Sequence, residues 1–207
     1  MNKPIIIIGN GGHASVLTEI LLAQKHTIIG FTAPTIEDNA FNLTYLGTDE
    51  AIESHNPSDI ELVLGIGTIK PSKLREELFN SYNSKNYRFK SVIHSSATIA
   101  SSVKLGQGVQ IMAGAIIQTN TIIADNSIIN TGALIDHDCH INAHIHIAPG
   151  TIISGGVCIQ QGTHIGTGAT IIQGIHIGSS CLIGAGAVVV NNIANGLKVV
   201  GVPAKEV

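Results

Sequence analysis

Residues 111–129 read IMAGAIIQTNTIIADNSII, and an isoleucine returns at every sixth place. The same period runs from Ile93 to Val189, where every sixth residue is isoleucine except Leu105 and Val189. The fifth residue of each hexad is mostly small or β-branched, and glycine or asparagine often stands between, where tight turns need it. A six-residue period predicts a solenoid in which each hexad forms one short strand and one corner.

Three hexads close a triangular coil of about 18 residues, so residues 18 apart are expected to stack. A β-sandwich would instead need alternation with a period of two and turns at longer, less regular intervals. The general rule for parallel crossovers gives a right-handed winding, and the hexads themselves do not choose the hand. The flat faces of such a prism are compatible with packing around a threefold axis.

The first part of the chain has a different pattern, in which the apolar period changes about every ten residues. It predicts a small Rossmann-like α/β unit of alternating strands and helices. The expected strands cover 4–8, 27–31 and 60–66, the expected helices cover 14–23 and 71–81, and a short helix begins at Thr48. We therefore predict two domains, 1–90 with the α/β fold and 91–207 with the parallel β-helix.

Composition excludes several classes of protein. The formal charge of −3 gives no basic field for nucleic acid or anionic lipid. No apolar stretch approaches the ~20 residues of a membrane-spanning helix, and the short run at 5–8 lacks the length of a signal-peptide core. The odd set of Cys139, Cys158 and Cys181 predicts reduced thiols with a packing role. We expect a cytoplasmic protein with neither nucleic acid nor membrane as a partner.

A glycine-rich loop follows the first expected strand. Residues 9–14 read GNGGHA and fit the pattern G-x-G-x-x-[GA], whose glycines let backbone amides approach a phosphate at a helix N-terminus. A nicotinamide dinucleotide site also needs an acidic residue after the second strand, where this chain has Thr32 and Ala33. We favour the phosphate of a sugar nucleotide, and a structural turn and a redox cofactor remain as alternatives.

Residues 135–147, IDHDCHINAHIHI, hold four of the chain's ten histidines. His137 precedes Asp138, and a histidine oriented by a carboxylate is suited to take a proton from an amine or hydroxyl. Gly155 lies 18 residues after His137, so its amide is expected beside the histidine as an oxyanion donor. His146 is half a coil from His137, so the two share a cleft only if subunits meet there. The other solenoid histidines are interpreted as exposed residues: His140, His144, His164 and His176.

Three motifs together resemble one family. They are the GNGGHA loop, NTGALIDHDCHI at 130–141, and GVPAK at 201–205. The combination resembles the NeuD/PglD-like sugar acyltransferases, which include sialic acid O-acetyltransferases and N-acetyltransferases of UDP-linked amino sugars and GDP-perosamine. The resemblance covers nearly the whole chain. It implies a left-handed hexapeptide-repeat β-helix, a homotrimer, and acetyl-CoA as co-substrate without a metal.

The resemblance also implies roles for individual residues. His137 would be the general base, and Asp138 would raise its basicity. The implied acetyl-CoA contacts are His146, Gly155, Thr167 and Ala185. The implied sugar-nucleotide contacts are Gly11, Gly12, His13 and Gly67. The chain departs from UDP-binding members at Thr32-Ala33 and at Thr68-Ile69, although Arg75 fits the family pattern, so the nucleotide base stays open.

We predict an acetyl-CoA-dependent N-acetyltransferase that acts on the amino group of a UDP- or GDP-linked amino-deoxysugar in surface-polysaccharide biosynthesis. The glycine loop favours this prediction, because a free sialic acid would need no phosphate site. O-acetylation of sialic acid or another surface sugar remains the main alternative. Two others are a non-catalytic β-helix scaffold and a zinc-dependent γ-class carbonic anhydrase. The zinc site would draw on His146 and His164, which are 18 residues apart, or on another possible cluster made of His140, His176 and Cys181.

Overall fold

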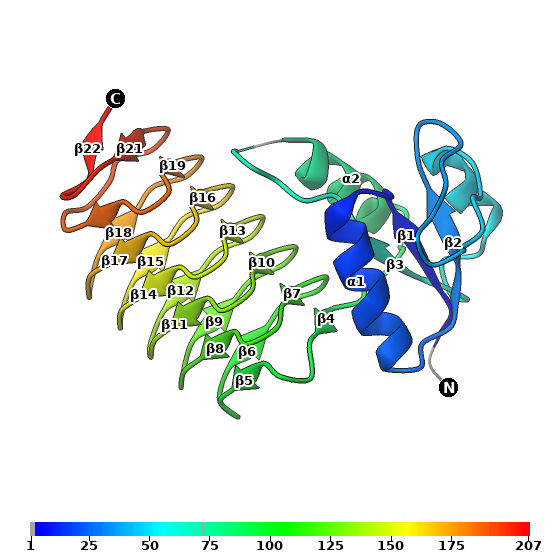
Figure 1. The fold of residues 1–207 in the computed structure, drawn as a ribbon, viewed down its shortest axis with the longest axis horizontal. Helices are drawn as coiled ribbons and strands as arrows, with labels where there is room; N and C mark the ends of the chain where they lie inside the picture. Colours follow the sequence, from blue (N-terminus) through cyan, green and yellow to red (C-terminus); the bar gives the residue numbers. More distant parts are fainter. Residues whose placement is uncertain (1–2, 72) are drawn as a thin grey trace. The chain divides into compact units, whose positions relative to one another are not determined.

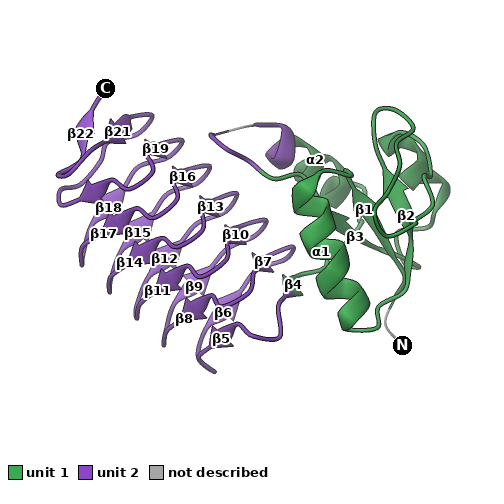
Figure 2. Ribbon diagram, viewed as in Figure 1, with its two compact units in different colours: residues 1–67, 77–92 green, residues 68–76, 93–207 purple. Residues whose placement is uncertain are grey.

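The computed structural model describes residues 3–71 and 73–207. The chain divides into two compact units, Met1–Gly67 with Glu77–Val92, and Thr68–Glu76 with Ile93–Val207 (Figure 2). The predicted boundary at residue 90 stays a prediction. The segment 68–76 was expected within the first domain, but it belongs to the unit that contains the solenoid.

The first unit contains a three-stranded parallel sheet of order β2-β1-β3. Its strands are β1 (Ile5–Ile8), β2 (Ile28–Thr32) and β3 (Glu61–Leu64). The remaining elements of this part of the chain are α1 (Gly12–Ala23), the 3-10 helix η1 (Asp49–Ser54) and α2 (Lys73–Ser84), whose first turn counts with the second unit. Because β1 is the central strand and all four of its side chains are buried, its sequence is a continuous apolar run.

The predicted elements are found with shifted ends. Helix α1 begins at Gly12, two residues earlier than expected, because Gly11 takes the extended N-cap conformation. Helix α2 runs on to Ser84. Thr48 does precede η1, but its side chain makes no capping hydrogen bond and contacts the Glu50 carboxylate instead.

The second unit is a parallel β-solenoid with three flat faces and the winding of a left-handed β-helix (Figure 1). The first face contains β4 (Val92–Ile93), β7 (Gln110–Ile111), β10 (Ile128–Ile129), β13 (His146–Ile147), β16 (His164–Ile165), β19 (Leu182–Ile183), β21 (Lys198–Val200) and β22 (Lys205–Glu206). The second face contains β5 (Thr98–Ile99), β8 (Ile116–Ile117), β11 (Leu134–Ile135), β14 (Ile152–Ile153), β17 (Thr170–Ile171) and β20 (Val188–Val189). The third face contains β6 (Lys104–Leu105), β9 (Ile122–Ile123), β12 (His140–Ile141), β15 (Cys158–Ile159) and β18 (His176–Ile177).

The stacking predicted from the repeat is confirmed, because residues 18 apart pair in register on every face. Ile135 pairs with Ile153 on the second face, and Ile141 pairs with Ile159 on the third. The second residue of each strand points inward, and from Ile111 to Val189 these side chains are buried in one continuous core. The first residue of each strand therefore points outward, where it is available for a site.

The corners of the solenoid also follow the six-residue period. Three residues after each inward aliphatic side chain, from Gly108 to Gly186, the backbone φ is positive. Most of these corner residues are glycine or asparagine, which adopt this conformation readily. Asp138, His144 and Ser180 are the others, and Asp and His are, after Gly and Asn, among the residues that adopt a positive φ most often.

Cys139 and Cys181 are buried in the solenoid core, as the packing interpretation requires. Cys158 differs, because it precedes the inward Ile159 and is half-buried at an outward position. All three are free thiols. Within the described residues, no helix has both the length and the apolar character needed to cross a bilayer.

Candidate active site

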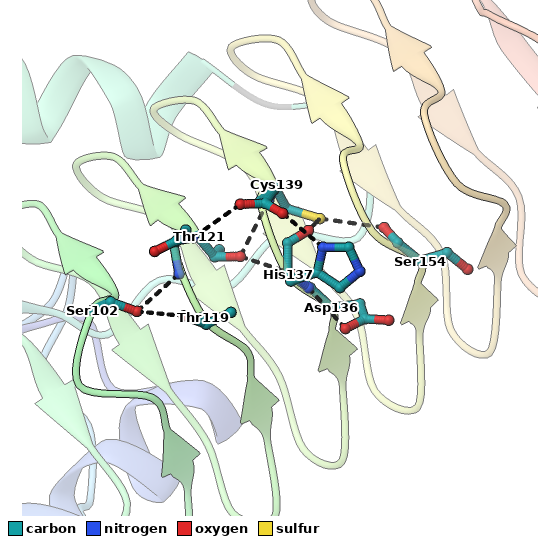
Figure 3. A network of polar contacts seen from close by, with 9 residues as sticks. Ser102, Thr119, Thr121, Asp136, His137, Cys139 and Ser154 are labelled. Carbon is teal, nitrogen blue, oxygen red and sulfur yellow. Dashed lines mark hydrogen bonds and ion pairs between the residues drawn. The ribbon is translucent and has the colours of Figure 1, made fainter.

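His137 and Asp138 lie on the corner that follows β11. Figure 3 shows His137 between Asp136 and Cys139. His137 Nδ1 lies 2.8 Å from Asp138 Oδ2, and the His137 amide donates to Asp136 Oδ1 at 2.8 Å. Because Nδ1 faces a carboxylate, the ring carries its proton there and leaves Nε2 as the basic nitrogen. Both side chains are about half exposed, at 54% and 57%, so the pair is open to a ligand.

A column of corner residues holds Asp138 in place. Asn120 lies 18 residues earlier, and its Nδ2 donates to Asp138 Oδ1 at 3.2 Å. The backbone N–H of Asn120 donates in turn to Ser102 Oγ at 2.9 Å. Ser102 lies another 18 residues earlier, and its hydroxyl also forms a hydrogen bond with Thr119 Oγ1. Sequence reasoning missed Asn120, although its spacing from Asp138 was the signal that could have found it.

The neighbouring carboxylates make His137 more basic. The hydrogen bond with Asp138 raises the pKa of His137, and the charge of Asp136 acts in the same direction. Conversely, the hydrogen bonds from His137 and then Asn120 lower the pKa of Asp138, which keeps that carboxylate ionised. In its neutral form His137 is therefore a stronger base than an isolated histidine.

Gly155 stacks on His137, as its 18-residue spacing predicted. A Cβ at residue 155 would lie 2.6 Å from His137 Cε1 and 2.7 Å from Nε2, so only glycine leaves room for the ring. Gly155 is also the only glycine at this place of the repeat between residues 95 and 191. Its carbonyl accepts from the Gly174 amide, while its own N–H donates to no group of the described residues. That N–H remains available beside the histidine.

Cys139 follows the pair, but it is not a nucleophile at neutral pH. Burial raises the pKa of its thiol to about 11. Its Sγ lies 3.3 Å from the Ser154 carbonyl and 3.7 Å from the carbonyl of His137. The thiol therefore packs inside the coil.

A groove of about 470 Å³ lies along the first face and its edge with the second face. It gathers three of the four implied acetyl-CoA residues, His146, Thr167 and Ala185. The fourth, Gly155, is not among its lining residues and lies with His137 on another corner. The groove is lined by Thr68, Ile69, Asn130, His146, Ala148, Pro149, His164, Gly166, Thr167, Leu182, Ile183, Gly184 and Ala185.

The ring nitrogens of His146 are both hydrogen-bonded within the protein. Asn130 Oδ1 accepts from the Thr131 amide at 2.8 Å, which turns its Nδ2 toward His146 Nε2 at 3.0 Å. His146 Nε2 is then the acceptor, so Nδ1 carries the proton and donates to the Thr68 carbonyl at 2.8 Å. Thr68 and Asn130 thus fix the tautomer of His146. Neither residue was singled out as a partner of His146 from the sequence.

The interpretation of the remaining histidines is corrected in part. His140 and His176 are exposed on the third face, as expected. His164 was expected to be exposed, but it is buried at 6% exposure and its ring lies edge-to-face on His146, 4.9 Å between centroids. His144 is half-buried, with Nδ1 2.9 Å from Asn126 Nδ2.

The residues considered for a zinc site are divided among three environments. His146 and His164 lie on the first face, His140 and His176 lie on the third, and Cys181 points into the core. No group of three histidine, cysteine or acidic residues with metal-ligand geometry occurs within 3–71 and 73–207.

The residues implied in sugar-nucleotide binding lie in the first unit, where the parallel strands β1 and β3 end. Gly11 and Gly12 are exposed at the N-terminus of α1, and a Cβ at either would meet no atom within 4 Å. A Cβ at Gly67 would lie 3.2 Å from that of His13, so these two residues are neighbours. This edge of a parallel sheet and the amides of a helix N-terminus are suited to a phosphate.

The region after β2 contains acidic groups that sequence reasoning did not use. Thr32 Oγ1 donates to Asp49 Oδ1 at 2.6 Å. Asn10, in the glycine loop, donates from Nδ2 to Glu37 Oε2 at 3.1 Å and accepts from Asn39 Nδ2 at 2.7 Å. A carboxylate therefore does lie beside the glycine loop, five residues beyond the end of β2.

A hexapeptide solenoid with a histidine and carboxylate on one corner, preceded by an α/β unit with a glycine loop, defines a class of acyltransferase. Comparison with protein families agrees with this class. Residues 4–82 match the family described as PglD N-terminal domain, and residues 98–136 match the family of bacterial transferase hexapeptides. No curated protein sequence matches the chain.

Solved structures place the chain more closely. It is 32% identical to the acetyltransferase domain of PglB from Neisseria gonorrhoeae FA1090, with a TM-score of 0.94 and all of both chains covered. It is 35% identical to PerB from Caulobacter crescentus, with a TM-score of 0.90 and 99% and 97% of the two chains covered. WeeI from Acinetobacter baumannii AYE, at 23% identity, has the same fold with a TM-score of 0.89. The chain belongs to the NeuD/PglD-like sugar acyltransferase family, and it is an acetyltransferase.

Proposed function

We propose that this protein transfers an acetyl group from acetyl-CoA to the amino group of a nucleotide-linked amino-deoxysugar. The observation that carries the proposal is the corner where Asp138 orients His137 and where Gly155, one coil further on, lies against the imidazole ring with an N–H that no described group accepts. Two similar structures support the choice of substrates. The PglB domain was solved with acetyl coenzyme A, and PerB was solved with CoA and GDP-perosamine.

The proposed reaction follows from the geometry of this corner. The sugar amine attacks the carbonyl carbon of the thioester, and His137 Nε2 takes the proton that the nitrogen loses. The Gly155 amide donates to the oxygen that becomes negative in the tetrahedral intermediate. When the C–S bond breaks, the protonated His137 returns its proton to the departing thiolate. Asp138 stabilises the imidazolium throughout, since it accepts from Nδ1.

The groove on the first face is the proposed acetyl-CoA site. Thr167 and Ala185 occupy the same place of the repeat as Gly155, two residues after an inward isoleucine. At this place the backbone N–H takes no part in coil-to-coil pairing, and in the described residues neither Thr167 nor Ala185 donates its N–H to a protein group. Such amides suit the carbonyl groups of a pantetheine arm. His146, held by Thr68 and Asn130, forms the wall of the groove.

The N-terminus of α1 is the proposed site for the phosphates of the sugar nucleotide. Gly11 and Gly12 offer exposed amides, and His13 and Gly67 lie beside each other at the same edge of the sheet. The diphosphate carries charge that a helix N-terminus attracts. We leave the base as uridine or guanosine. A cytoplasmic location and a role in surface-polysaccharide biosynthesis stay predictions.

We further propose a homotrimer with the reaction site between copies. Most outward side chains of the second face are apolar, with threonine at the outward positions of β5 and β17, and this apolar surface favours contact with another copy. Its members are Ile116, Leu134, Ile152 and Val188. The corner with His137 and the edge with Thr167 and Ala185 lie on opposite sides of this face. Packing around a threefold axis would bring the corner of one copy toward the groove of the next.

One experiment tests the function. The protein is incubated with acetyl-CoA and, separately, with UDP-, GDP- and CMP-linked sugars, their free forms and sialic acid, and products are identified by mass. We expect a gain of one acetyl group on the amine of a UDP- or GDP-linked amino sugar. Acetylation of free sialic acid at a hydroxyl, at a higher rate than any nucleotide sugar, would contradict the proposal in favour of O-acetylation.

A second experiment tests the shared site. Mixed trimers are formed from one chain with His137→Ala and another with a bulky substitution in the groove, Ala185→Trp. We expect partial recovery of activity, because one interface then has both intact parts. The matched control pairs His137→Ala with Gly155→Val, and since these two residues lie in one chain, no recovery is expected. A monomer in sedimentation would contradict the arrangement.

A further inference from the structure

The outward residues of the first face form a ladder in which two histidines stand between aliphatic side chains. In register they are Ile128, His146, His164 and Leu182. Ile128 and His164 are both buried, so an aliphatic residue is accepted in this ladder. Packing alone therefore does not require a histidine at 164.

The two histidines of this ladder differ in what their ring nitrogens do. His146 has both nitrogens engaged, by Asn130 and Thr68. His164 Nδ1 is buried, and in 3–71 and 73–207 it has no hydrogen-bond partner. A buried N–H without an acceptor is rarer than a buried acceptor without a donor. The proton of the neutral ring is therefore best placed on Nε2.

The surroundings keep His164 neutral. Burial lowers its pKa. The thirteen residues that line the groove include no Lys, Arg, Asp or Glu. A groove of this composition suits the uncharged pantetheine arm of an acyl-CoA and not its phosphates. Amide carbonyl oxygens of that arm are neutral acceptors, which a neutral imidazole N–H can match.

We propose that His164 is a ligand-binding residue of the groove, and that its Nε2–H donates a hydrogen bond to an amide carbonyl of the pantetheine arm. The inference rests on the proposed function, because it takes acetyl-CoA as the occupant of the groove. It assigns to His146 a supporting role, since that ring is engaged by the protein and meets His164 edge-to-face. The hydrogen-bond donor that remains for a ligand is the N–H at Nε2 of His164.

The test uses His164→Phe in the full chain, with calorimetric binding of acetyl-CoA. Phenylalanine fills the site and keeps the edge-to-face contact but removes the donor. We expect a dissociation constant for acetyl-CoA raised about 3- to 10-fold, the loss of one neutral hydrogen bond. The KM for acetyl-CoA should rise equally, with little change in kcat or in the KM for the sugar nucleotide. The melting temperature should not fall, because a buried polar group has been removed.

Two further variants and a truncated ligand locate the contact. His164→Gln restores a donor and should recover part of the affinity. His176→Phe makes the same change at the same place of the repeat on the exposed third face and should leave binding unchanged. The penalty of His164→Phe should persist with S-acetyl-pantetheine, which lacks the phosphates and adenosine. If the penalty disappears with this ligand, or if His164→Phe binds acetyl-CoA like the wild type, the inference is wrong while the proposed function stands. If the wild type binds no acetyl-CoA, the proposed function fails as well.

Discussion

Two pairs of side chains in one solenoid show how repeat position determines chemistry. His137 and Asp138 occupy a corner, are half exposed, and are held by a column of polar residues at 18-residue intervals. His146 and His164 occupy outward strand positions on the first face and are buried, at 9% and 6% exposure. The corner offers a basic nitrogen to a ligand, whereas the face offers a neutral wall. On the proposals made above, the same residue type serves proton transfer in one place and binding in the other.

The largest expected effect comes from removing the corner base. His137→Asn should lower kcat by ~100- to 10,000-fold, since a general base acts in the transition state. The dissociation constant for acetyl-CoA should change little, because the groove residues are intact. Steady-state kinetics with calorimetry checks both values. A variant that keeps half of the wild-type kcat would remove His137 from the mechanism and break the contrast between corner and face.

The next effect tests whether the corner depends on Gly155 leaving room for the ring. In Gly155→Ala, the new Cβ would lie 2.6 Å from His137 Cε1 and must displace the histidine. A shift of about 1 Å in a catalytic group can cost about 100-fold, and we expect a loss of kcat of that order. Ala143→Ser is the matched control, because it also adds one heavy atom at the same place of the repeat. Equal rates for Gly155→Ala and the wild type would contradict the stacked arrangement.

A pH profile of Asp138→Asn separates orientation from basicity. Asparagine suits the positive φ of this corner, as it does at Asn120 and Asn126, so the backbone is kept. The neutral imidazole is the active form, so kcat/KM rises as the pH passes upward through the pKa of His137. The Asp138 hydrogen bond raises that pKa, and its loss must move the acidic limb to lower pH. We also expect a roughly 10-fold lower plateau. If the acidic limb does not move, it reports the ionisation of a group other than His137.

The smallest effect concerns the glycine loop of the first unit. In Gly12→Val the new side chain meets no protein atom within 4 Å of its Cβ, so the fold should tolerate it. A ligand that approaches the amides of α1 would be blocked, and the KM for the sugar nucleotide should rise roughly 5-fold, with that for acetyl-CoA unchanged. His13→Ala should act in the same direction by about 2- to 10-fold. A rise confined to acetyl-CoA would contradict the assignment of this loop to the acceptor.

The solenoid could be predicted because its period is local. Each hexad repeats one strand and one corner, so the positions of Ile135, His137 and Gly155 follow from counting. The burial of His146 and His164 could not be found in this way. It depends on contacts distant in sequence, such as that between Thr68 and His146, which are 78 residues apart. No repeat pattern records which outward face another segment will cover.

In the α/β unit, too, the local pattern of strands and helices could be predicted, but the contacts made by its loops could not. The strand–helix alternation was visible, and the ends of the elements shifted by up to three residues. The acidic partner of the glycine loop was sought directly after β2, where the chain has Thr32 and Ala33. It is supplied instead by Glu37 through Asn10, which a loop conformation determines and a fixed spacing does not.

The parallel pairing at 18-residue intervals also limits how this chain can change in length. An insertion of six residues between β13 and β14 would move every later strand to the next face. Thr167 and Ala185 would then flank a different face from His146, although every inward isoleucine would still find a place in the core. An insertion of a whole coil would keep each face in order. Length variants of this enzyme should therefore retain activity in steps of one coil, while single-hexad variants remain folded and inactive.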